Sequence, residues 1–170
     1  AGTRTALPTL AGWTPIASFD GPATQGATPS DANVAVSATQ VVVVFNLSYV
    51  VYDRSGAVLA GPAPLQTFWA GGGDRCAARN DGDPVVRYDQ LAHRWFVSQF
   101  VRTTPFAQCV AVSQTDDATG AWFHWTYPLS AFGDYPKVGV WPDGYYVTYN
   151  MFDGGGASIG GSGVTQQYNR

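Results

Sequence analysis

From residue 31 onward, the chain alternates short runs of β-branched and aromatic residues with clusters of turn-forming residues. No segment of useful length repeats its apolar positions with the 3.6-residue period of a helix, whereas two-residue alternation is frequent. Turns are predicted at 53–56, 116–120 and 142–144, where Asp or Pro begins the turn and Gly closes it. The pattern therefore predicts an all-β protein. The expected strands are 33–37, 40–46, 49–53, 64–69, 84–89, 94–100, 107–113, 121–127, 136–141 and 145–151.

This strand pattern repeats along the chain. Asp31, Asp83 and Asp134 each precede a short apolar strand, and the steps between them are 52 and 51 residues. A turn and a more aromatic strand follow each time. That second strand carries an amide at a similar place, namely Asn46, Gln99 and Asn150. Four antiparallel strands in about 51 residues is the size of one β-propeller blade, so the sequence predicts about two and a half blades starting near 31, 83 and 134.

The predicted organisation is an extended lead-in over 1–30 followed by a partial propeller over 31–170. A propeller closes its ring with roughly four to eight blades, and an incomplete ring exposes sheet faces that favour aggregation. We therefore expect a second polypeptide that supplies the remaining blades, most simply from the same precursor. The Gly-rich segment 154–163, expected to be flexible, and the final Arg170 suggest cleavage by a trypsin-like protease, with a natural C-terminus as the alternative.

Composition narrows the possible partners and the compartment. The chain is 45% hydrophobic and 12% charged, which is typical of a globular protein, and its formal net charge of −3 argues against nucleic acid as the main ligand. No run of eighteen apolar residues is present, so no membrane span is predicted. The opening AGTRTALPTL has the small residues of a mature N-terminus left after processing, which favours a secreted protein.

Two cysteines, Cys76 and Cys109, are spaced to close a loop of 33 residues. A disulfide between them would stabilise the fold by roughly 3–4 kcal/mol in the chain-entropy interpretation. The pairing agrees with an oxidising, extracellular compartment. The alternative is that both are small buried hydrophobic residues.

Candidate chemistry follows from the predicted ring. The first strand of each blade lines the channel, so Asp31, Asp83 and Asp134 are expected near one another at one mouth. Carboxylates that converge in this way are what glycoside hydrolysis requires, and the three are our catalytic candidates. The alternative is structural: each accepts backbone hydrogen bonds in the turn before its strand.

Other polar residues are predicted at the same mouth. Arg87, Lys137 and Tyr135 are the candidates for ligand binding. Asp81 and Asp83, in the sequence DGD, offer the hard oxygen ligands that calcium prefers, so calcium is the one cofactor that the sequence suggests.

Two stretches resemble known families. Residues 113–122, SQTDDATGAW, are similar to the Asp-box turn of sialidase-like propellers, with one extra residue between Asp116 and Gly120. Residues 75–155 resemble secreted bacterial β-propeller proteins that have no assigned function, a resemblance that implies fold and export but no catalytic residues. The Asp-Pro pair at 83–84 is also similar to arabinanase-like five-bladed glycosidases, which usually take their acid from a glutamate; this chain has no glutamate.

Two functions remain open at this point. One is a propeller scaffold that binds a ligand, a glycan or a protein. The other is a glycan-directed enzyme, a hydrolase or lyase, with an acidic site at the channel mouth. The fold alone does not choose between them.

Overall fold

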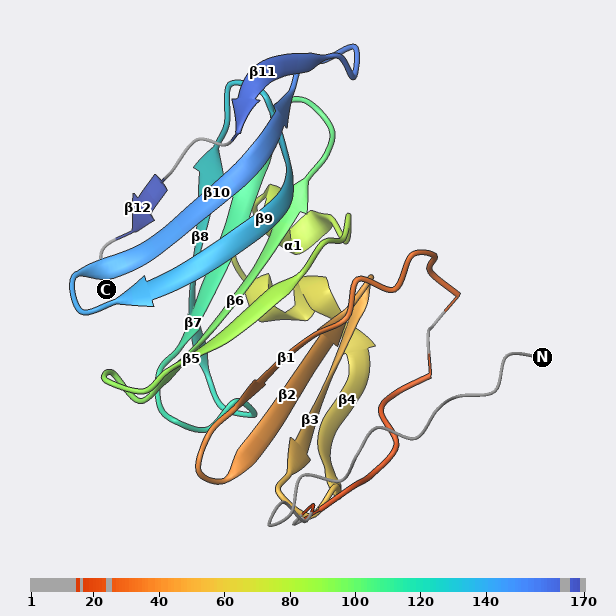
Figure 1. Ribbon diagram of the computed structural model, residues 1–170, viewed down its shortest axis with the longest axis vertical. Coiled ribbons are helices and arrows are strands. Elements are labelled where there is room, and N and C mark those ends of the chain that lie inside the picture. The colour runs from red at the N-terminus through yellow and green to blue at the C-terminus, as the bar shows by residue number, and fades with distance from the viewer. Residues whose placement is uncertain (1–14, 16, 24–25, 163–165, 169–170) are drawn as a thin grey trace, which may run out of the picture.

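The computed structural model describes residues 15, 17–23, 26–162 and 166–168 and consists almost wholly of antiparallel β-strands (Figure 1). The predicted all-β class is confirmed. Within the described residues, helix is confined to a 3-10 segment, η1 (Leu65–Trp69), and a short helix, α1 (Arg75–Ala78). No helix in this part of the chain is long and apolar enough to cross a membrane. The described part of the lead-in, up to residue 30, contains no strand, and the rest of it lies outside the described residues.

The strands form three sheets that follow one another along the chain. In the first two sheets, each strand pairs with the next, in the orders β1-β2-β3-β4 and β5-β6-β7-β8. In the third, β9 pairs with one side of β10, and β11 and β12 pair with successive parts of its other side. The bounds are β1 Asn33–Val36, β2 Gln40–Phe45, β3 Ser48–Asp53, β4 Val58–Pro64, β5 Val85–Asp89, β6 Arg94–Val101, β7 Ala107–Ser113, β8 Trp122–Pro128, β9 Phe132–Trp141, β10 Gly144–Phe152, β11 Ser158–Ser162 and β12 Gln166–Tyr168.

One expected strand was wrong, and one expected loop segment contains a strand. The predicted strand 64–69 is the 3-10 segment η1, and the fourth strand of the first sheet is β4, which precedes it. Leu65, Phe68 and Trp69 are all buried, a spacing that places them on one side of a helical turn rather than on one face of a strand. The segment 154–163, expected to be flexible, contains β11, which pairs with β10.

The strand register makes the three sheets equivalent position by position. Within the first hairpin of each sheet, the corresponding cross-strand pairs are Val34 with Val43, Val86 with Val97, and Val138 with Val147. The side of a sheet that looks toward the sheet before it in the chain is here termed its preceding face, and the opposite side its following face. These six valines all belong to preceding faces, because alternate residues of a strand point to opposite sides.

Sheets pack following face against preceding face, and the core lies between them. The first sheet contributes Val42, Val44 and Val51, and the second contributes Trp95, Val97 and Ala111. The second and third sheets meet in the same way through Val85, Phe96, Val110, Val138, Tyr145 and Val147. The first strands β1, β5 and β9 consequently lie side by side (Figure 1).

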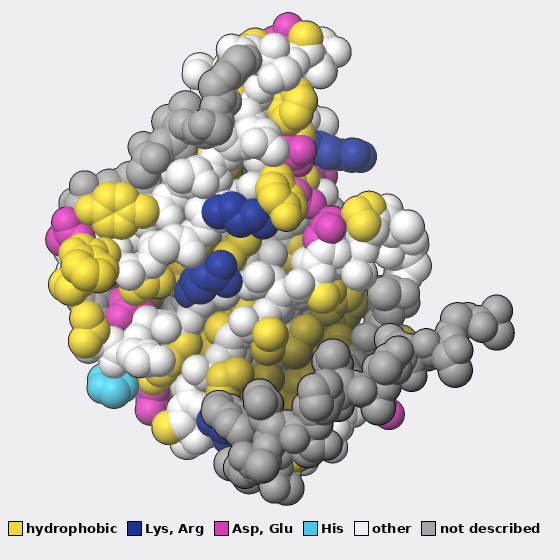
Figure 2. Space-filling model, in the orientation of Figure 1, with side chains coloured by type: hydrophobic (Ala, Val, Ile, Leu, Met, Phe, Trp, Pro, Cys, Tyr) yellow, Lys and Arg dark blue, Asp and Glu magenta, His cyan; other side chains and the backbone are white. Residues whose placement is uncertain are grey.

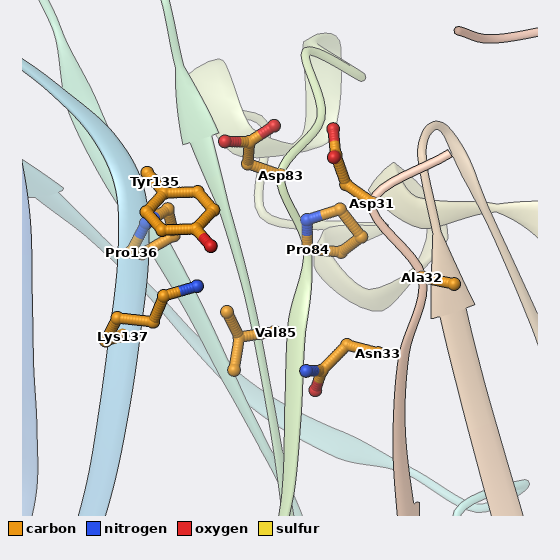
Figure 3. Close-up of a pocket in the computed structure, with 9 residues that line it drawn as sticks. All are labelled: Asp31, Ala32, Asn33, Asp83, Pro84, Val85, Tyr135, Pro136 and Lys137. Atoms are coloured by element: carbon orange, nitrogen blue, oxygen red, sulfur yellow. The ribbon is translucent and has the colours of Figure 1, made fainter. Parts of the chain in front are cut away.

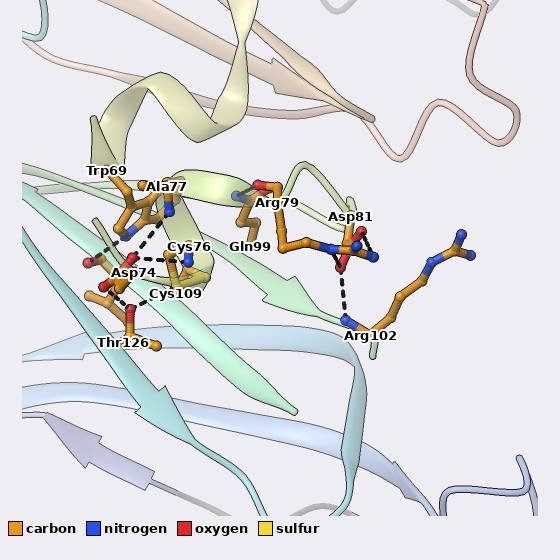
Figure 4. Close-up of a disulfide and its surroundings, with 11 residues drawn as sticks. Trp69, Asp74, Cys76, Ala77, Arg79, Asp81, Gln99, Arg102, Cys109 and Thr126 are labelled. Atoms are coloured by element: carbon orange, nitrogen blue, oxygen red, sulfur yellow. Dashed lines mark hydrogen bonds and ion pairs between the residues drawn. A yellow bond between two sulfur atoms is a disulfide. The ribbon is translucent and has the colours of Figure 1, made fainter. Parts of the chain in front are cut away.

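The connection between the first two sheets is held by the predicted disulfide, which the structure confirms (Figure 4). Cys76 in α1 is bonded to Cys109 in β7, with the two Cα atoms 5.6 Å apart. Asp74 caps α1 by accepting the backbone N–H groups of Cys76 and Ala77, and it also accepts the hydroxyl of Thr126. Burial on its own would raise the pKa of Asp74, but these hydrogen bonds lower it overall, so the carboxylate is a stable cap.

Candidate ligand-binding site

One pocket is built by the same three positions of each sheet. It is lined by the segments 31–33 and 83–85, which lead into β1 and β5, and by 135–137, which lies within β9 (Figure 3). Its volume is about 180 Å³. The three segments are spaced by 52 residues, so the pocket has approximate threefold repetition. The sheet packing described above is what brings these distant segments together.

The first residue of each segment has an unusual backbone. Asp31, Asp83 and Tyr135 have φ values of 41°, 45° and 52°. This left-handed region is uncommon for residues other than glycine and is least expected of a bulky side chain such as that of Tyr135. The conformation precedes the first strand in the first two sheets and interrupts β9 in the third. Its repetition identifies the three residues as equivalent.

The repeat therefore differs by one residue from the alignment based on Asp134. Asn46 donates its backbone N–H to the residue before Asp31, and Phe100 donates its own to the residue before Asp83. In the third sheet, Asn150 lies opposite Asp134 in the same register. Tyr135 is thus the equivalent of Asp31 and Asp83, and Phe100 takes the place that the sequence pattern gave to Gln99.

Two of the three candidate carboxylates point into the same part of the pocket. Figure 3 shows the carboxylates of Asp31 and Asp83 next to one another, and the Tyr135 hydroxyl and the Lys137 ammonium group close together at another part of the pocket. The charge of Asp134 acts on Asp83, and a wider hollow of about 460 Å³ beside the pocket is lined by all three carboxylates. The structure therefore brings Asp31, Asp83 and Asp134 together.

The environment of Asp83 is the most perturbed in the pocket. Burial is the largest cause, and the negative charges of Asp134 and Asp31 add to it, raising the pKa of Asp83 to about 6. A hydrogen bond with the backbone of Tyr135 acts in the opposite direction. This carboxyl group therefore keeps its proton to a higher pH than an ordinary aspartate does.

The side chain of Asn46 orders this side of the pocket. Its amide nitrogen donates to Asp31 Oδ2 at 2.5 Å and to the Pro29 carbonyl at 2.8 Å. Its amide oxygen accepts the backbone N–H of Asp83 at 2.8 Å. Gly82 makes room for this contact, because a Cβ atom there would lie 2.8 Å from Asn46 Oδ1, and its φ is 112°.

The two predicted cationic residues have different environments. Lys137 Nζ lies 3.3 Å from the centre of the Tyr135 ring, a cation–π contact at the pocket wall. Arg87 lies on β5 and forms hydrogen bonds to the first strands of the other two sheets. Nη1 donates to Asn33 Oδ1 in β1 at 2.9 Å, and Nε donates to the Val138 carbonyl in β9 at 3.1 Å. Desolvation lowers the pKa of Arg87, although not far enough to discharge a guanidinium group. Lys137 and Tyr135 therefore face the pocket, whereas Arg87 joins its walls.

Asp81 lies at the rim of the wider hollow with partners of its own. Its carboxylate forms an ion pair with Arg79 at 3.1 Å and accepts the backbone N–H of Arg102 at 3.1 Å (Figure 4). Among the residues that the structure describes, no group of three or more His, Cys, Asp or Glu side chains is arranged to hold a metal ion. Calcium at Asp81 and Asp83 stays a prediction from the sequence.

The Asp-box-like turn between β7 and β8 is organised by Asp117 rather than by Asp116. The Asp117 carboxylate accepts the backbone N–H and the hydroxyl of Thr119 at 2.9 and 2.8 Å. It also accepts the side-chain amide of Gln40 at 2.7 Å, and Gln40 Oε1 takes the N–H of Ala118. The turn therefore ties the second sheet to the first at the end of the strands far from the pocket.

Sequence reasoning missed the roles of Asn33 and Gln40, which both connect one sheet to the next. The equivalent positions in the other two sheets hold residues of other types, so the sequence repeat did not point to Asn33 or Gln40. Asn46 was noted as part of an amide repeat, but its contact with two pocket residues depends on the sheet packing. No protein-family model, curated protein or solved structure matches the chain.

Proposed function

We propose that this chain supplies three blades of a secreted β-propeller that acts as a binding scaffold, with its ligand held at the pocket of segments 31–33, 83–85 and 135–137. The observation that carries the proposal is that three equivalent segments, 52 residues apart, converge on one pocket through sheets that pack face to face. This is the arrangement that blades around a common axis produce.

A ring of this kind needs more sheets than the described residues contain, so the proposal includes a second polypeptide that completes it. Among the described residues, one face of the first sheet has no neighbouring sheet, which supports this. Val34 is 56% exposed and Val36 is 44% exposed there. Figure 2 shows hydrophobic side chains gathered over the first sheet. The most direct test is the mass of the native material by size-exclusion chromatography with mass spectrometry. A folded monomer of 18.1 kDa with nothing attached would contradict the ring.

The pocket favours a polar, uncharged or cationic ligand with several hydroxyl groups, such as a glycan. Two carboxylates offer acceptors, Lys137 and the Tyr135 hydroxyl offer donors, and the ring of Tyr135, with 57% of the residue exposed, offers an apolar surface. Glycans present this combination of hydroxyl groups and apolar ring faces. An anionic ligand would meet two carboxylates against one ammonium group and is disfavoured.

Glycan-array binding followed by calorimetry tests this part of the proposal, using the native assembly. Asp31→Asn and Lys137→Gln are expected to weaken binding of the best glycan at least tenfold, since each loses a charged hydrogen-bond partner of about 1.5–3 kcal/mol. Asp116→Asn, which changes an exposed carboxylate away from the pocket, is the matched control and is expected to bind within twofold of the unmodified protein. Equal binding by all three variants would exclude the pocket as the ligand site.

A second candidate is a glycan-directed enzyme, and the environment of Asp83 is the observation that favours it. A carboxyl group with a pKa of about 6 retains part of its proton near neutral pH and can serve as a general acid. The neighbouring Asp31 would then act as base or nucleophile. Reducing-end release from the bound glycan, abolished in Asp83→Asn while binding is retained, would support the enzyme. Tight binding without product release would contradict the enzyme and favour the binding scaffold.

A further inference from the structure

The pocket and the wider hollow beside it share part of their walls. Asp31 and Asp83 line both of them. The rest of the pocket is lined by Tyr135, their equivalent in the third sheet, and by residues that follow these three positions. The rest of the hollow is lined by residues that precede the three positions, or that lie at or just beyond the ends of β2 and β6. The two carboxylates therefore stand at the boundary, and a ligand that extends from the pocket into the hollow passes them.

The two volumes indicate how long the ligand is. The pocket measures about 180 Å³ and the hollow about 460 Å³. Sites that enclose most of a small organic ligand commonly measure about 300–1,000 Å³. The pocket alone is smaller than such a site, whereas the hollow falls within the range. A ligand of more than one small unit that is held in the pocket therefore has room to continue only where the hollow opens beside Asp31 and Asp83.

The hollow has an apolar wall. Leu47, in the turn between β2 and β3, lines it and is 37% exposed. The side-chain amide of Asn80 donates to the Leu47 carbonyl at 2.8 Å and so holds the turn that carries this leucine. Phe100 and Phe132 also line the hollow, with their ring centres 5.0 Å apart. The wall offers apolar surface to a sugar ring, as the ring of Tyr135 does in the pocket.

The hollow also has a cationic hydrogen-bond donor. Arg102, just beyond the end of β6, lines the hollow and is exposed. Its backbone N–H donates to Asp81, whereas its guanidinium group extends away from that carboxylate (Figure 4). Among the described residues, Asp81 forms its ion pair with Arg79, and none accepts a hydrogen bond from the Arg102 guanidinium. The backbone of Arg102 is thus held in place while its side-chain donors stay free.

We infer that the pocket and the hollow are two subsites for one neutral oligosaccharide, which passes from one to the other beside Asp31 and Asp83. One sugar unit binds in the pocket. The next units bind in the hollow, along Leu47, with the Arg102 guanidinium donating to their hydroxyl groups. This inference rests on the proposed function and adds to it the length of the ligand and the residues that recognise its second part.

Binding of sugars of increasing length tests the inference on the native assembly. The probes are glucose, xylose and mannose and their β-1,4-linked oligomers up to the tetrasaccharide, and NMR titration measures the affinity of each. In a series that binds, the affinity is expected to increase at least tenfold from the monosaccharide to the trisaccharide. An affinity that is the same at every length would overturn the inference and leave the pocket as the ligand site. Absence of binding in all three series would contradict the neutral glycan of the proposed function and, with it, the inference.

Substitutions locate the second subsite. Arg102→Ala removes a charged donor and is expected to lower the affinity for the trisaccharide at least tenfold, while it changes that for the monosaccharide less than twofold. Lys137→Gln, in the pocket, is expected to lower both affinities by the same factor. Arg94→Ala, at the opposite end of β6 from Arg102, is the matched control and is expected to leave both within twofold. If Arg102→Ala lowers both affinities equally, or changes neither, the second subsite is wrong and the pocket alone binds the sugar.

Discussion

The guanidinium group of Arg87 and the side-chain oxygen of Asn33 are 2.9 Å apart, and this hydrogen bond joins the first strand of one sheet to the first strand of the next. The same Asn33 oxygen also accepts the backbone N–H of Val86, and Arg87 continues to the Val138 carbonyl in the third sheet. One polar chain thus crosses three sheets beside the pocket. These bonds connect walls of the pocket that are far apart in sequence.

Arg87 is therefore expected to matter for stability more than for ligand contact. Arg87→Ala removes hydrogen bonds from a charged group to two neighbouring strands and leaves the acceptors without it, so we expect a loss of about 1.5–3 kcal/mol in the free energy of unfolding. Arg87→Lys is expected to recover little, since one ammonium group cannot reproduce the fork geometry. Urea denaturation measures both. Arg102→Ala, an exposed arginine, is the control and is expected to stay within about 0.5 kcal/mol.

The raised pKa of Asp83 predicts a particular dependence of stability on pH. Because the fold raises this pKa from 3.8 to about 6, it favours the protonated form. That contribution to stability is fully present below pH 3.8 and is lost as the pH rises through about 6. We measure the melting temperature of Asp83→Asn minus that of the unmodified protein. This difference is expected to increase steadily from pH 4 to pH 7. A constant difference over this range would show that Asp83 does not titrate as described, and Asp116→Asn serves as the control.

The disulfide is predicted to be a major contribution to stability. Replacing Cys76 and Cys109 together by alanine opens a loop of 33 residues and is expected to cost roughly 3–4 kcal/mol. A reducing agent should lower the melting temperature of the unmodified protein toward that of the double variant. The double variant itself should not respond to the reducing agent, and a response would mean that the reductant acts elsewhere.

Gly82 is predicted to be required by the pocket. Gly82→Ala would place a Cβ atom 2.8 Å from Asn46 Oδ1 at a φ of 112°. The clash and the backbone strain together are expected to cost about 1–3 kcal/mol and to weaken ligand binding, because Asn46 positions Asp31 and Asp83. Gly139→Ala is the matched control: no atom lies within 4 Å of its added Cβ, and its φ is not in the left-handed region. In thermal denaturation, Gly82→Ala is expected to have a clearly lower melting temperature than Gly139→Ala.

The local chemistry of the strands and turns could be predicted from the sequence. Alternating valines and aromatic residues such as those of 94–101 have no helical period, so an all-β fold with hairpins was predictable, and Cys76 and Cys109 were a plausible pair. A step of 52 and then 51 residues was visible because a strand–turn–strand unit leaves a repeated pattern. The segment Leu65–Trp69 was misassigned because a five-residue apolar run fits a strand as well as one turn of helix.

Only the tertiary structure decided which residues meet at the pocket. Sequence alignment placed Asp134 with Asp31 and Asp83, but hydrogen-bond register and the positive φ of Tyr135 shift the equivalence by one residue. A one-residue shift exchanges the side chains that face the pocket and those that face the core, so it is the register, not the spacing, that fixes the site. The bonds from Arg87 to Asn33 and to the backbone of the third sheet likewise exist only because sheets pack face to face. A sequence records the pattern within each sheet, and the contacts between sheets arise from three-dimensional packing.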